Sequence, residues 1–254
     1  LLDLSMFTIG TFSWGNLTAA TVAIGEFALL FVLPLYLINA YGTSVIDAGL
    51  ILAAMALGAF ISGGLARHIA ARLGPAGTVI LGLGLELAGV AALASFMDPA
   101  KSLVYLVAPL LAYGLGLGLA SAQLTGTILR DVPVAKSGQG SATQSTVRQV
   151  GSALGTAFSG GALAVGLGSS LPNALSSFNL PAAKLDDLIA ATKASAGSNL
   201  LQMREQMGTE SELVSHLVDG FAQATRSSLW ASATFLGVGL LGSIMVWFAA
   251  RKSD

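Results

Sequence analysis

The sequence contains no cysteine and only two histidines, and charged residues occupy 10% of its 254 positions. The absence of cysteine excludes disulfides, thiol catalysis and thiolate metal sites. Soluble domains average about 25% charged residues, so the deficit excludes an ordinary soluble domain. The net charge of −1 gives no indication of a nucleic-acid partner. We therefore expect no metal site, no cofactor and no nucleic-acid partner.

Six long apolar stretches fill most of the chain instead. Hydrophobic residues make up 54% of the sequence, and its mean hydropathy is +0.77. A helix needs about 20 apolar residues to cross a hydrocarbon core about 30 Å thick, and each stretch has about that length. The pattern predicts an all-α membrane protein with six transmembrane helices. They are expected at Leu17–Ala40, Ala48–Ala66, Gly77–Met97, Leu103–Leu124, Ser141–Leu167 and Ser228–Ala249.

These stretches divide the chain into five parts. The chain opens Leu1-Leu2-Asp3, with no initiator methionine and no recognisable signal peptide, so we expect a fragment whose upstream part is missing. The parts are a lead-in at 1–16, the first five helices at 17–167, a long segment at 168–227, the last helix at 228–249 and a tail at 250–254.

The distribution of basic residues predicts the orientation of the chain. Lys and Arg gather in the cytoplasmic loops of membrane proteins. Alternate short loops carry most of the basic residues, whereas the short loops on the other side hold only Lys101. We therefore expect a multi-pass protein of the plasma (inner) membrane with both ends cytoplasmic and the 168–227 segment outside. The four basic residues of the expected inner loops are Arg67, Arg72, Arg130 and Lys136.

The long 168–227 segment has helical patterns of its own. Asn179-Leu180-Pro181 followed by Leu185, Leu188 and Ile189 predicts an amphipathic helix that stops near Gly197. Thr209-Glu210-Ser211-Glu212 fits a capping box, after which Leu213, Leu217 and Phe221 continue at helical spacing toward the last span. The segment is interpreted as a surface cap, with substrate gating as the alternative.

Small residues recur at four-residue spacing in two of the expected helices. Gly114 and Gly118 form one series, and Gly151, Gly155 and Ser159 form the other. Such faces allow helix backbones to approach closely in a membrane. Glycine also lowers helix propensity, so the helix with Gly114 and Gly118 can bend. These properties suit a moving bundle, although static bundles use the same residues.

Three ionisable residues fall inside the expected spans. Each costs about 2.5–3.5 kcal/mol near a helix centre on insertion scales. Glu26 lies mid-span, with Pro34 two turns later as an expected kink, and it can serve as a proton site or pack as a neutral acid. Glu86 has no polar neighbour three or four positions away. Arg148 either snorkels to the interface or pairs with a carboxylate or an anionic substrate group.

Several stretches resemble one family. The run Pro34-Leu35-Tyr36-Leu37 with Gly42, Ser44 and Ala48-Gly49-Leu50 is similar to the C-terminal half of fourteen-span drug:proton antiporters of the major facilitator superfamily (EmrB/QacA type). The most specific block is Gly114-x-Gly116-x-Gly118, Val132-Pro133, Gly138-x-Gly140-Ser141-Ala142, Arg148 and Gly151-x-x-x-Gly155-Thr156-Ala157. The stretch Gly64-Leu65-Ala66-Arg67 to Arg72-Leu73-Gly74 resembles the superfamily's loop between its second and third helices, although Arg67-His68 stands where an acidic residue is usual.

The resemblance implies one half of a major-facilitator bundle, built from two inverted three-helix repeats. In that architecture the first and fourth helices line the cavity and the third and sixth face lipid, which favours Glu26 over Glu86. The implied partners are the lipid bilayer, a small-molecule substrate, protons and the missing N-terminal half of the same transporter. The candidates for proton coupling are Glu26 and Arg148. The candidates for the substrate cavity, each of which could also be a structural polar group, are Tyr36, Asn39, Gln123 and Gln144. The candidates for conformational change are Pro34, Gly64, Arg67, Arg72, Gly114, Gly118, Gly151 and Gly155.

The leading hypothesis is a proton-coupled exporter of drugs or other amphipathic compounds that works by alternating access. An intramembrane protease of the rhomboid type needs a histidine within a span, whereas His68 and His216 lie outside the expected spans, so we do not expect an enzyme. A voltage sensor needs an arginine-rich span, and none is present. A carrier of another small solute, such as a metabolite exporter, and a non-transporting membrane subunit stay open as alternatives.

Overall fold

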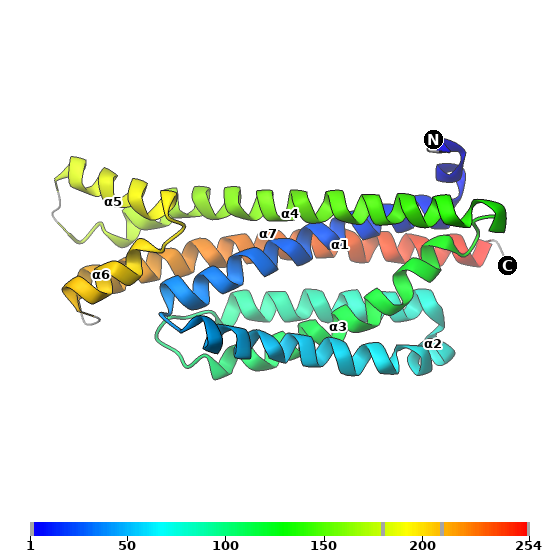
Figure 1. The fold of residues 1–254 in the computed structure, drawn as a ribbon, viewed down its shortest axis with the longest axis horizontal. Helices are drawn as coiled ribbons and strands as arrows, with labels where there is room; N and C mark the ends of the chain where they lie inside the picture. Colours follow the sequence, from blue (N-terminus) through cyan, green and yellow to red (C-terminus); the bar gives the residue numbers. More distant parts are fainter. Residues whose placement is uncertain (1–2, 179–180, 209–210, 253–254) are drawn as a thin grey trace.

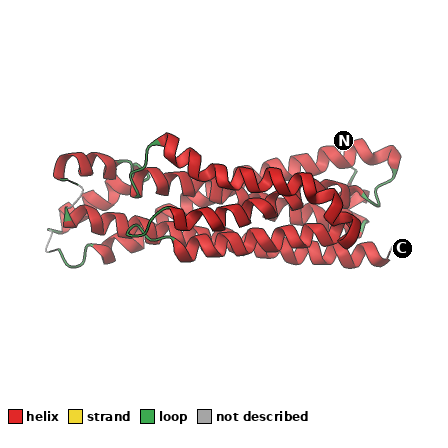
Figure 2. Cartoon of the chain, turned by 90° about the horizontal axis from the view of Figure 1, so that it is seen from below, coloured by secondary structure: helices red, strands yellow, loops and turns green. Residues whose placement is uncertain are grey.

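The computed structural model describes residues 3–178, 181–208 and 211–252, which are almost entirely helical, with loops gathered at the two ends of an elongated bundle (Figure 2). The π-helical turn η2 at Tyr36–Ala40 follows α1, and 3-10 turns occur at Leu4–Thr8 (η1) and Val134–Lys136 (η3). The helices are α1 (Gly10–Leu35), α2 (Val45–Phe96), α3 (Val104–Leu129), α4 (Ser137–Ala174), α5 (Ala182–Ala194), α6 (Asn199–Met207) and α7 (Glu212–Lys252).

Five of the described helices, α1, α2, α3, α4 and α7, are long and apolar enough to cross a membrane. The six expected stretches lie within these five because two of them fall on α2. A straight helix of 52 residues would be about 78 Å long, far more than a bilayer needs. However, α2 is not straight: Figure 1 shows the ribbon reversing direction within it. We call residues 45–73 the first arm of α2 and residues 75–96 its second arm.

The reversal of α2 occurs at a single glycine. Gly74 has φ 74° and ψ 163°, a conformation that side-chain-bearing residues rarely adopt. Pro75 suits the first position of the second arm, and the Thr78 hydroxyl donates to the Gly74 carbonyl at 2.9 Å. The expectation of a loop from Gly64 to Gly74 is therefore wrong. Residues 64–73 are helical, so Gly64, Arg67 and Arg72 lie on the first arm.

The helices extend beyond the apolar stretches because backbone hydrogen bonding continues where the hydrophobic composition ends. Helix α1 begins at Gly10, so the expected lead-in is partly helical. Helix α4 runs on to Ala174 and α7 begins at Glu212, so much of the 168–227 segment belongs to these helices or to α5 and α6. Leu217 and Phe221 lie on α7 and are fully buried. Asn179, Leu180, Thr209 and Glu210, which belong to two of the expected motifs, lie outside the described residues.

The long helices form two layers. Figure 1 shows α1, α4 and α7 along one side of the molecule and α3 with the two arms of α2 along the other. Within the first layer, α4 lies against α1 through the predicted series of small residues. A Cβ at Gly151 would meet the Ala20 carbonyl oxygen at 2.7 Å, and one at Gly155 would meet the Ile24 Cα at 2.9 Å. Ser159 donates to the Ala28 carbonyl at 2.9 Å.

The second layer is organised by alternate glycines of α3. A Cβ at Gly114 would fall 2.9 Å from the Cα of Met55, and one at Gly118 would fall 2.8 Å from the backbone N of Gly63, both on the first arm of α2. Gly116 faces the opposite way, so a Cβ there would fall 2.6 Å from the backbone N of Glu86 on the second arm. The absence of side chains on both faces lets α3 fit between the two arms.

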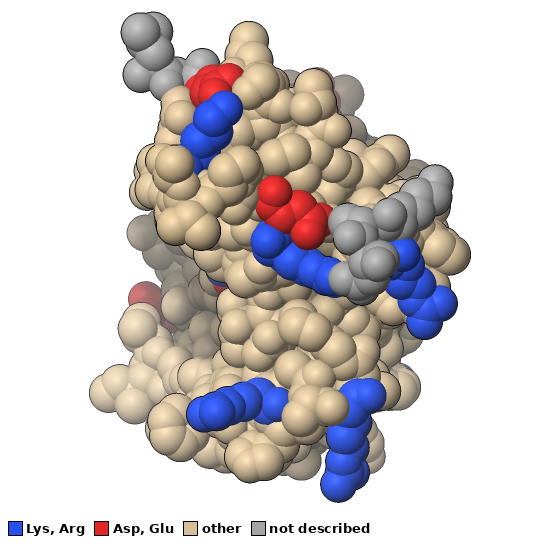
Figure 3. Space-filling view, turned by 90° about the vertical axis from the view of Figure 1, so that its right-hand side faces the viewer, with Lys and Arg blue, Asp and Glu red and all other residues tan. Residues whose placement is uncertain are grey.

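The two ends of the bundle differ in their contents. The first and last described residues lie at one end, where Lys and Arg side chains gather (Figures 1 and 3). At this end the Lys136 ammonium is 2.6 Å from the Asp3 carboxylate. The opposite end carries α5 and α6, which are tied to the end of η2. Asn39 donates to the Ala196 carbonyl at 2.9 Å and the Arg204 guanidinium donates to the Ala40 carbonyl. Burial lowers the pKa of Arg204.

Candidate functional site

An ion pair joins α1 to α4 in the middle of the first layer. The Arg148 guanidinium donates to the Glu26 carboxylate at 3.1 Å, although the two residues are 122 positions apart in the sequence. Glu26 is 7% exposed, whereas the Arg148 side chain is 36% exposed. Of the two readings of Arg148, the structure supports pairing with a carboxylate. The close contact of Gly151 and Gly155 with α1 brings the two side chains within reach.

A polar cavity of about 360 Å³ opens beside this ion pair. Helix α4 supplies most of its wall, α1 supplies Phe27 and α3 supplies Thr125. The wall combines a guanidinium, two amides and three hydroxyls, which can bind hydrogen-bonding or anionic groups of a ligand. A ligand that engages Arg148 would compete with Glu26 for the same cation. The residues from α4 are Gln144, Ser145, Arg148, Gln149 and Ser152.

Only one of the four predicted substrate-cavity residues lines this cavity. Gln144 does so, and it is nearly buried. Gln123 is half-buried and is not part of the lining. Tyr36 belongs to the hydrophobic core, and Asn39 binds the Ala196 carbonyl between α5 and α6. The structure therefore brings Glu26, Arg148 and Gln144 together and places Tyr36 and Asn39 elsewhere, Asn39 at the end that carries α5 and α6.

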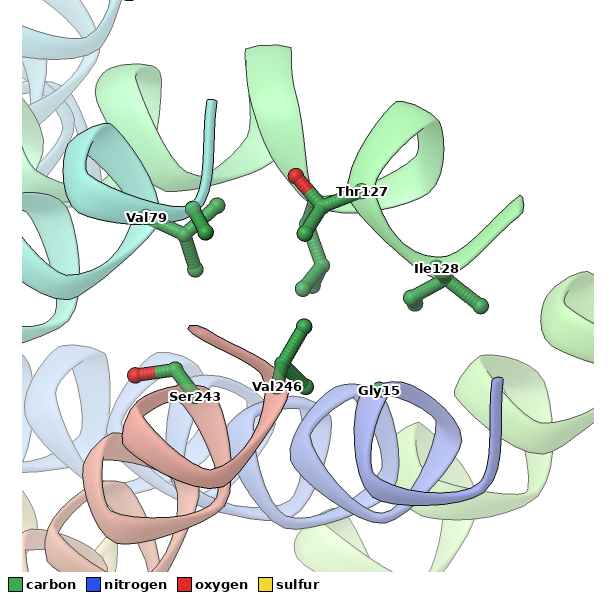
Figure 4. A pocket seen from close by; sticks show the side chains of 8 residues that line it. Gly15, Val79, Thr127, Ile128, Ser243 and Val246 are labelled. Carbon is green, nitrogen blue, oxygen red and sulfur yellow. The ribbon is translucent and has the colours of Figure 1, made fainter. Parts of the chain in front are cut away.

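A second pocket lies where α1, α2, α3 and α7 converge (Figure 4). Its lining is mainly apolar, with Gly15, Val79 and Val246 among the contributors. The Thr127 hydroxyl donates to the Gln123 carbonyl at 2.8 Å, and the Ser243 hydroxyl donates to the Leu240 carbonyl at 2.7 Å. Both hydroxyls are used within their own helices, and the pocket has no room for a water molecule, so it is a packing gap. The candidate site is therefore the roomier cavity at Arg148.

Glu86 lies at a contact between helices. The resemblance implied that its helix faces lipid, and the Glu86 side chain is 0% exposed on the face of that helix that packs against Gly116 of α3. The sequence carried a signal that could have predicted this contact. Gly82, four positions before Glu86, and Gly89, three positions after it, lie on the same face of the helix as Glu86. A glycine-lined face predicts a helix contact rather than a lipid contact.

The described residues hold no cluster of three or more His, Asp or Glu side chains that could bind a metal ion. The polar groups that a ligand could contact at this site are therefore those of the ion pair, the amides and the hydroxyls.

Comparison with known proteins identifies the class. The family model described as the Major Facilitator Superfamily matches residues 4–156, which is more than half of the chain. The chain belongs to this superfamily, whose members are transporters and not enzymes. With its apolar helices, this membership indicates an integral membrane protein.

Several curated relatives have names that concern transport. A riboflavin transporter, RibZ, of Clostridioides difficile is 32% identical over 162 residues, which cover 62% of this chain and 34% of the relative. A tetracenomycin C resistance and export protein of Streptomyces glaucescens is 30% identical over 186 residues, covering 71% of this chain and 34% of the relative. A multidrug resistance protein B homologue of Mycobacterium tuberculosis is 28% identical over 158 residues, covering 62% and 29%. The chain spans about a third of the length of these relatives.

Proposed function

We propose that this chain is the C-terminal half of a fourteen-span, EmrB/QacA-type transporter that exports drugs or other amphipathic compounds in exchange for protons. The likeness to part of longer relatives named for multidrug resistance and export supports the half-transporter and the substrate class. If the two arms of α2 cross the membrane separately, the five long helices provide six spans, the number that one half of a major-facilitator bundle needs.

The missing N-terminal half would cover the exposed apolar face of this half. The first arm of α2 exposes Leu50, Leu57 and Phe60, and α4 exposes Val150 and Leu154. In a membrane such residues contact either lipid or another part of the protein. We propose that the faces of α2 and α4 close the central cavity against the other half, and that the conformational candidates act by letting α1, α2, α3 and α4 bend and slide.

The observation that carries proton coupling is the Glu26–Arg148 pair at the edge of the cavity. A carboxylate removed from water is stable as an anion only while a cation or donors stay beside it. A cationic substrate group that binds the ionised Glu26 carboxylate displaces the Arg148 guanidinium from it. A proton that binds Glu26 neutralises this carboxylate and releases the cationic group. Substrate and proton therefore exclude each other at Glu26, as exchange across a membrane requires.

The charge distribution supports a plasma-membrane orientation with both ends cytoplasmic. The end that holds both termini carries Arg72, Arg130, Lys136 and Arg251 at or near the helix ends. The excess of basic residues agrees with the tendency of cytoplasmic loops to hold Lys and Arg. In this orientation α5 and α6 form an extracytoplasmic cap.

The test uses the complete transporter in inverted vesicles, with a fluorescent amphipathic cation as substrate. We expect Glu26→Gln to abolish substrate movement driven by a proton gradient, because an amide cannot bind and release the proton. Glu205→Gln on α6 makes the same chemical change at an exposed position and should keep full activity. If Glu26→Gln transported as fast as the wild type, its role in proton coupling would be rejected.

A carrier of another small solute is the second candidate function, because one relative is named as a riboflavin transporter. The same vesicles separate the two. Proton-dependent movement of riboflavin, without movement of amphipathic cations, would favour the second candidate.

A further inference from the structure

Another cavity, of about 290 Å³, lies at the basic end of the bundle, where the reversal of α2 meets the ends of α3 and α7 (Figure 1). The wall includes Gly74 from the reversal, Gly126 and Arg130 from the end of α3, and Trp247 and Arg251 from the end of α7. None of the described residues of α1 or α4 lines this cavity, so it is separate from the cavity at Arg148.

The charged groups in the wall of this cavity are two arginines. The guanidinium carbon of Arg251 lies 3.7 Å from the centre of the Trp247 ring. Stacking of this kind engages the flat face of a guanidinium and leaves the N–H donors at its edge to bind a ligand. The Arg130 Nε is 3.8 Å from the Asp131 carboxylate, so Arg130 has a counter-ion and Arg251 is the principal cation for a ligand.

These groups favour a ligand with a net negative charge. Neither Asp nor Glu is among the described residues of the wall. A guanidinium can donate two parallel hydrogen bonds to a phosphate. The ring of Trp247 could otherwise hold a quaternary ammonium, but Arg251 already occupies it. The cavity therefore suits an anionic phosphate group better than a zwitterionic one that carries choline.

Glycines leave open space beside the two arginines. A Cβ built at Gly74 or at Gly126 would have no neighbouring atom within 4 Å. At Gly74 the positive φ also disfavours any side chain. The wall beside the guanidinium groups is therefore partly bare backbone, which a polar headgroup can approach closely.

An apolar stripe on α7 leads to this cavity. Leu241, Met245 and Phe248 are exposed, and Arg251 follows Phe248 by three positions. Residues at three- and four-position spacing lie on one face of a helix, so the stripe ends at the basic cavity. In a membrane such a stripe contacts hydrocarbon, whereas Trp and Arg are typical of the boundary with water. An anionic head joined to apolar chains matches both parts of this surface.

We propose that the cavity binds one anionic phospholipid of the cytoplasmic leaflet, with its phosphate at Arg251 and Arg130 and its acyl chains along the stripe on α7. Basic pockets between transmembrane helices on the cytoplasmic side suit such headgroups. The choice of leaflet rests on the proposed orientation, but the binding itself depends on neither the exported substrate nor proton coupling. The bound lipid would join the reversal of α2 to the ends of α3 and α7.

Native mass spectrometry of the complete transporter in detergent tests the site, with phosphatidylglycerol and phosphatidylcholine of the same acyl chains as probes. We expect the first phosphatidylglycerol to bind more tightly than phosphatidylcholine. Arg251→Gln should weaken phosphatidylglycerol binding about fivefold and leave phosphatidylcholine binding unchanged. Arg251→Lys, which keeps the charge, should retain more of the affinity. Arg67→Gln makes the same change at an exposed position outside the cavity and should bind as the wild type does.

A second variant tests the space instead of the charge. Gly126→Leu should fill the cavity without meeting a neighbouring atom, and leucine raises helix propensity, so the protein should fold and bind less phosphatidylglycerol. Gly161→Leu on α4 makes the same change in equally open surroundings and should not alter binding. Thermal unfolding without added lipid checks that each variant is folded.

Three results would overturn the proposal. The first is equal affinity for the two lipids, and the second is phosphatidylglycerol affinity that neither Arg251→Gln nor Gly126→Leu reduces. The third is displacement of phosphatidylglycerol by equimolar glycerol phosphate, which would show that the cavity selects a small anion without acyl chains. These measurements use neither substrate nor a proton gradient, so failure of the proposed export function would leave them unaffected.

Discussion

Two glutamates of similar sequence context have opposite surroundings in the folded chain. Glu26 and Glu86 both lie within apolar stretches, yet Glu26 faces the Arg148 cation and Glu86 faces a glycine of α3. The difference arises from which helix packs beside each one. Pairs of titratable groups held in contrasting environments are typical of sites that move protons. The chemistry of the site is thus set by neighbours rather than by residue type.

The Asp3–Lys136 pair allows a prediction at the scale of single residues. Hydrogen bonds from Lys136 and from Ser5 lower the pKa of Asp3 to about 2. Because the folded-state pKa is lowered, the pair stabilises the fold above the unfolded value of 3.8, and this contribution is lost as pH falls toward 2. We expect Lys136→Gln to raise the pKa of Asp3 toward 3.8, measured by NMR titration of the labelled carboxyl carbon. Lys184→Gln, a control on α5, should leave that pKa where it is.

Glycines at helix contacts and glycines in open space have different roles along the same element. On α4, Gly155 lies against the backbone of Ile24, whereas nothing lies within 4 Å of a Cβ built at Gly161. An added methyl group therefore meets backbone atoms at one position and open space at the other. This contrast separates packing from helix propensity, because alanine raises propensity at both positions.

We expect Gly155→Ala to destabilise the chain by about 1–3 kcal/mol, because overpacking forces α4 away from α1. Gly161→Ala should stabilise the chain by up to about 1 kcal/mol through helix propensity. Thermal unfolding in detergent, followed by circular dichroism, measures both. Changes of the same sign and size would contradict the assignment of Gly155 to the contact.

The existence of the spans could be predicted from the sequence, but their ends and partners could not. Apolar composition located the long helices because about 20 such residues are needed to cross a bilayer. It did not locate the start of α7 at Glu212, which was indicated instead by the helical spacing of Leu213, Leu217 and Phe221. The pairing of Glu26 with Arg148 and the burial of Glu86 depend on which helices are neighbours. The sequence also could not show that the partner of Asn39 is the Ala196 carbonyl, because that carbonyl lies in a distant segment.

At the scale of the whole molecule, the two ends and the two layers define how the chain would sit in a membrane. Both termini share the basic end, and α5 and α6 cover the other (Figure 1). Apart from Glu26, Arg148 and Glu86, the interior of the two layers is mainly apolar, and the charged residues at helix ends lie outside it. This arrangement makes the orientation testable by labelling at either end.

Because this chain has no native cysteine, a single introduced cysteine is the only thiol within it that a maleimide can label. Val45, 73% exposed at the start of α2, and Val134, 90% exposed between α3 and α4, lie at opposite ends. We expect a membrane-impermeant maleimide to label Val45→Cys in intact cells and Val134→Cys only after permeabilisation. The reverse result would invert the proposed orientation.

The division into two layers has a mechanical consequence for the buried acids. Glu26 and Arg148 belong to one layer and Glu86 to the other, and α3 is held between the arms of α2 by glycine contacts on both faces. The second layer is therefore expected to shift as a rigid block. Glu86 moves with that block, whereas the Glu26–Arg148 pair stays with the other layer, so any displacement between the layers changes how the two buried acids are placed relative to each other.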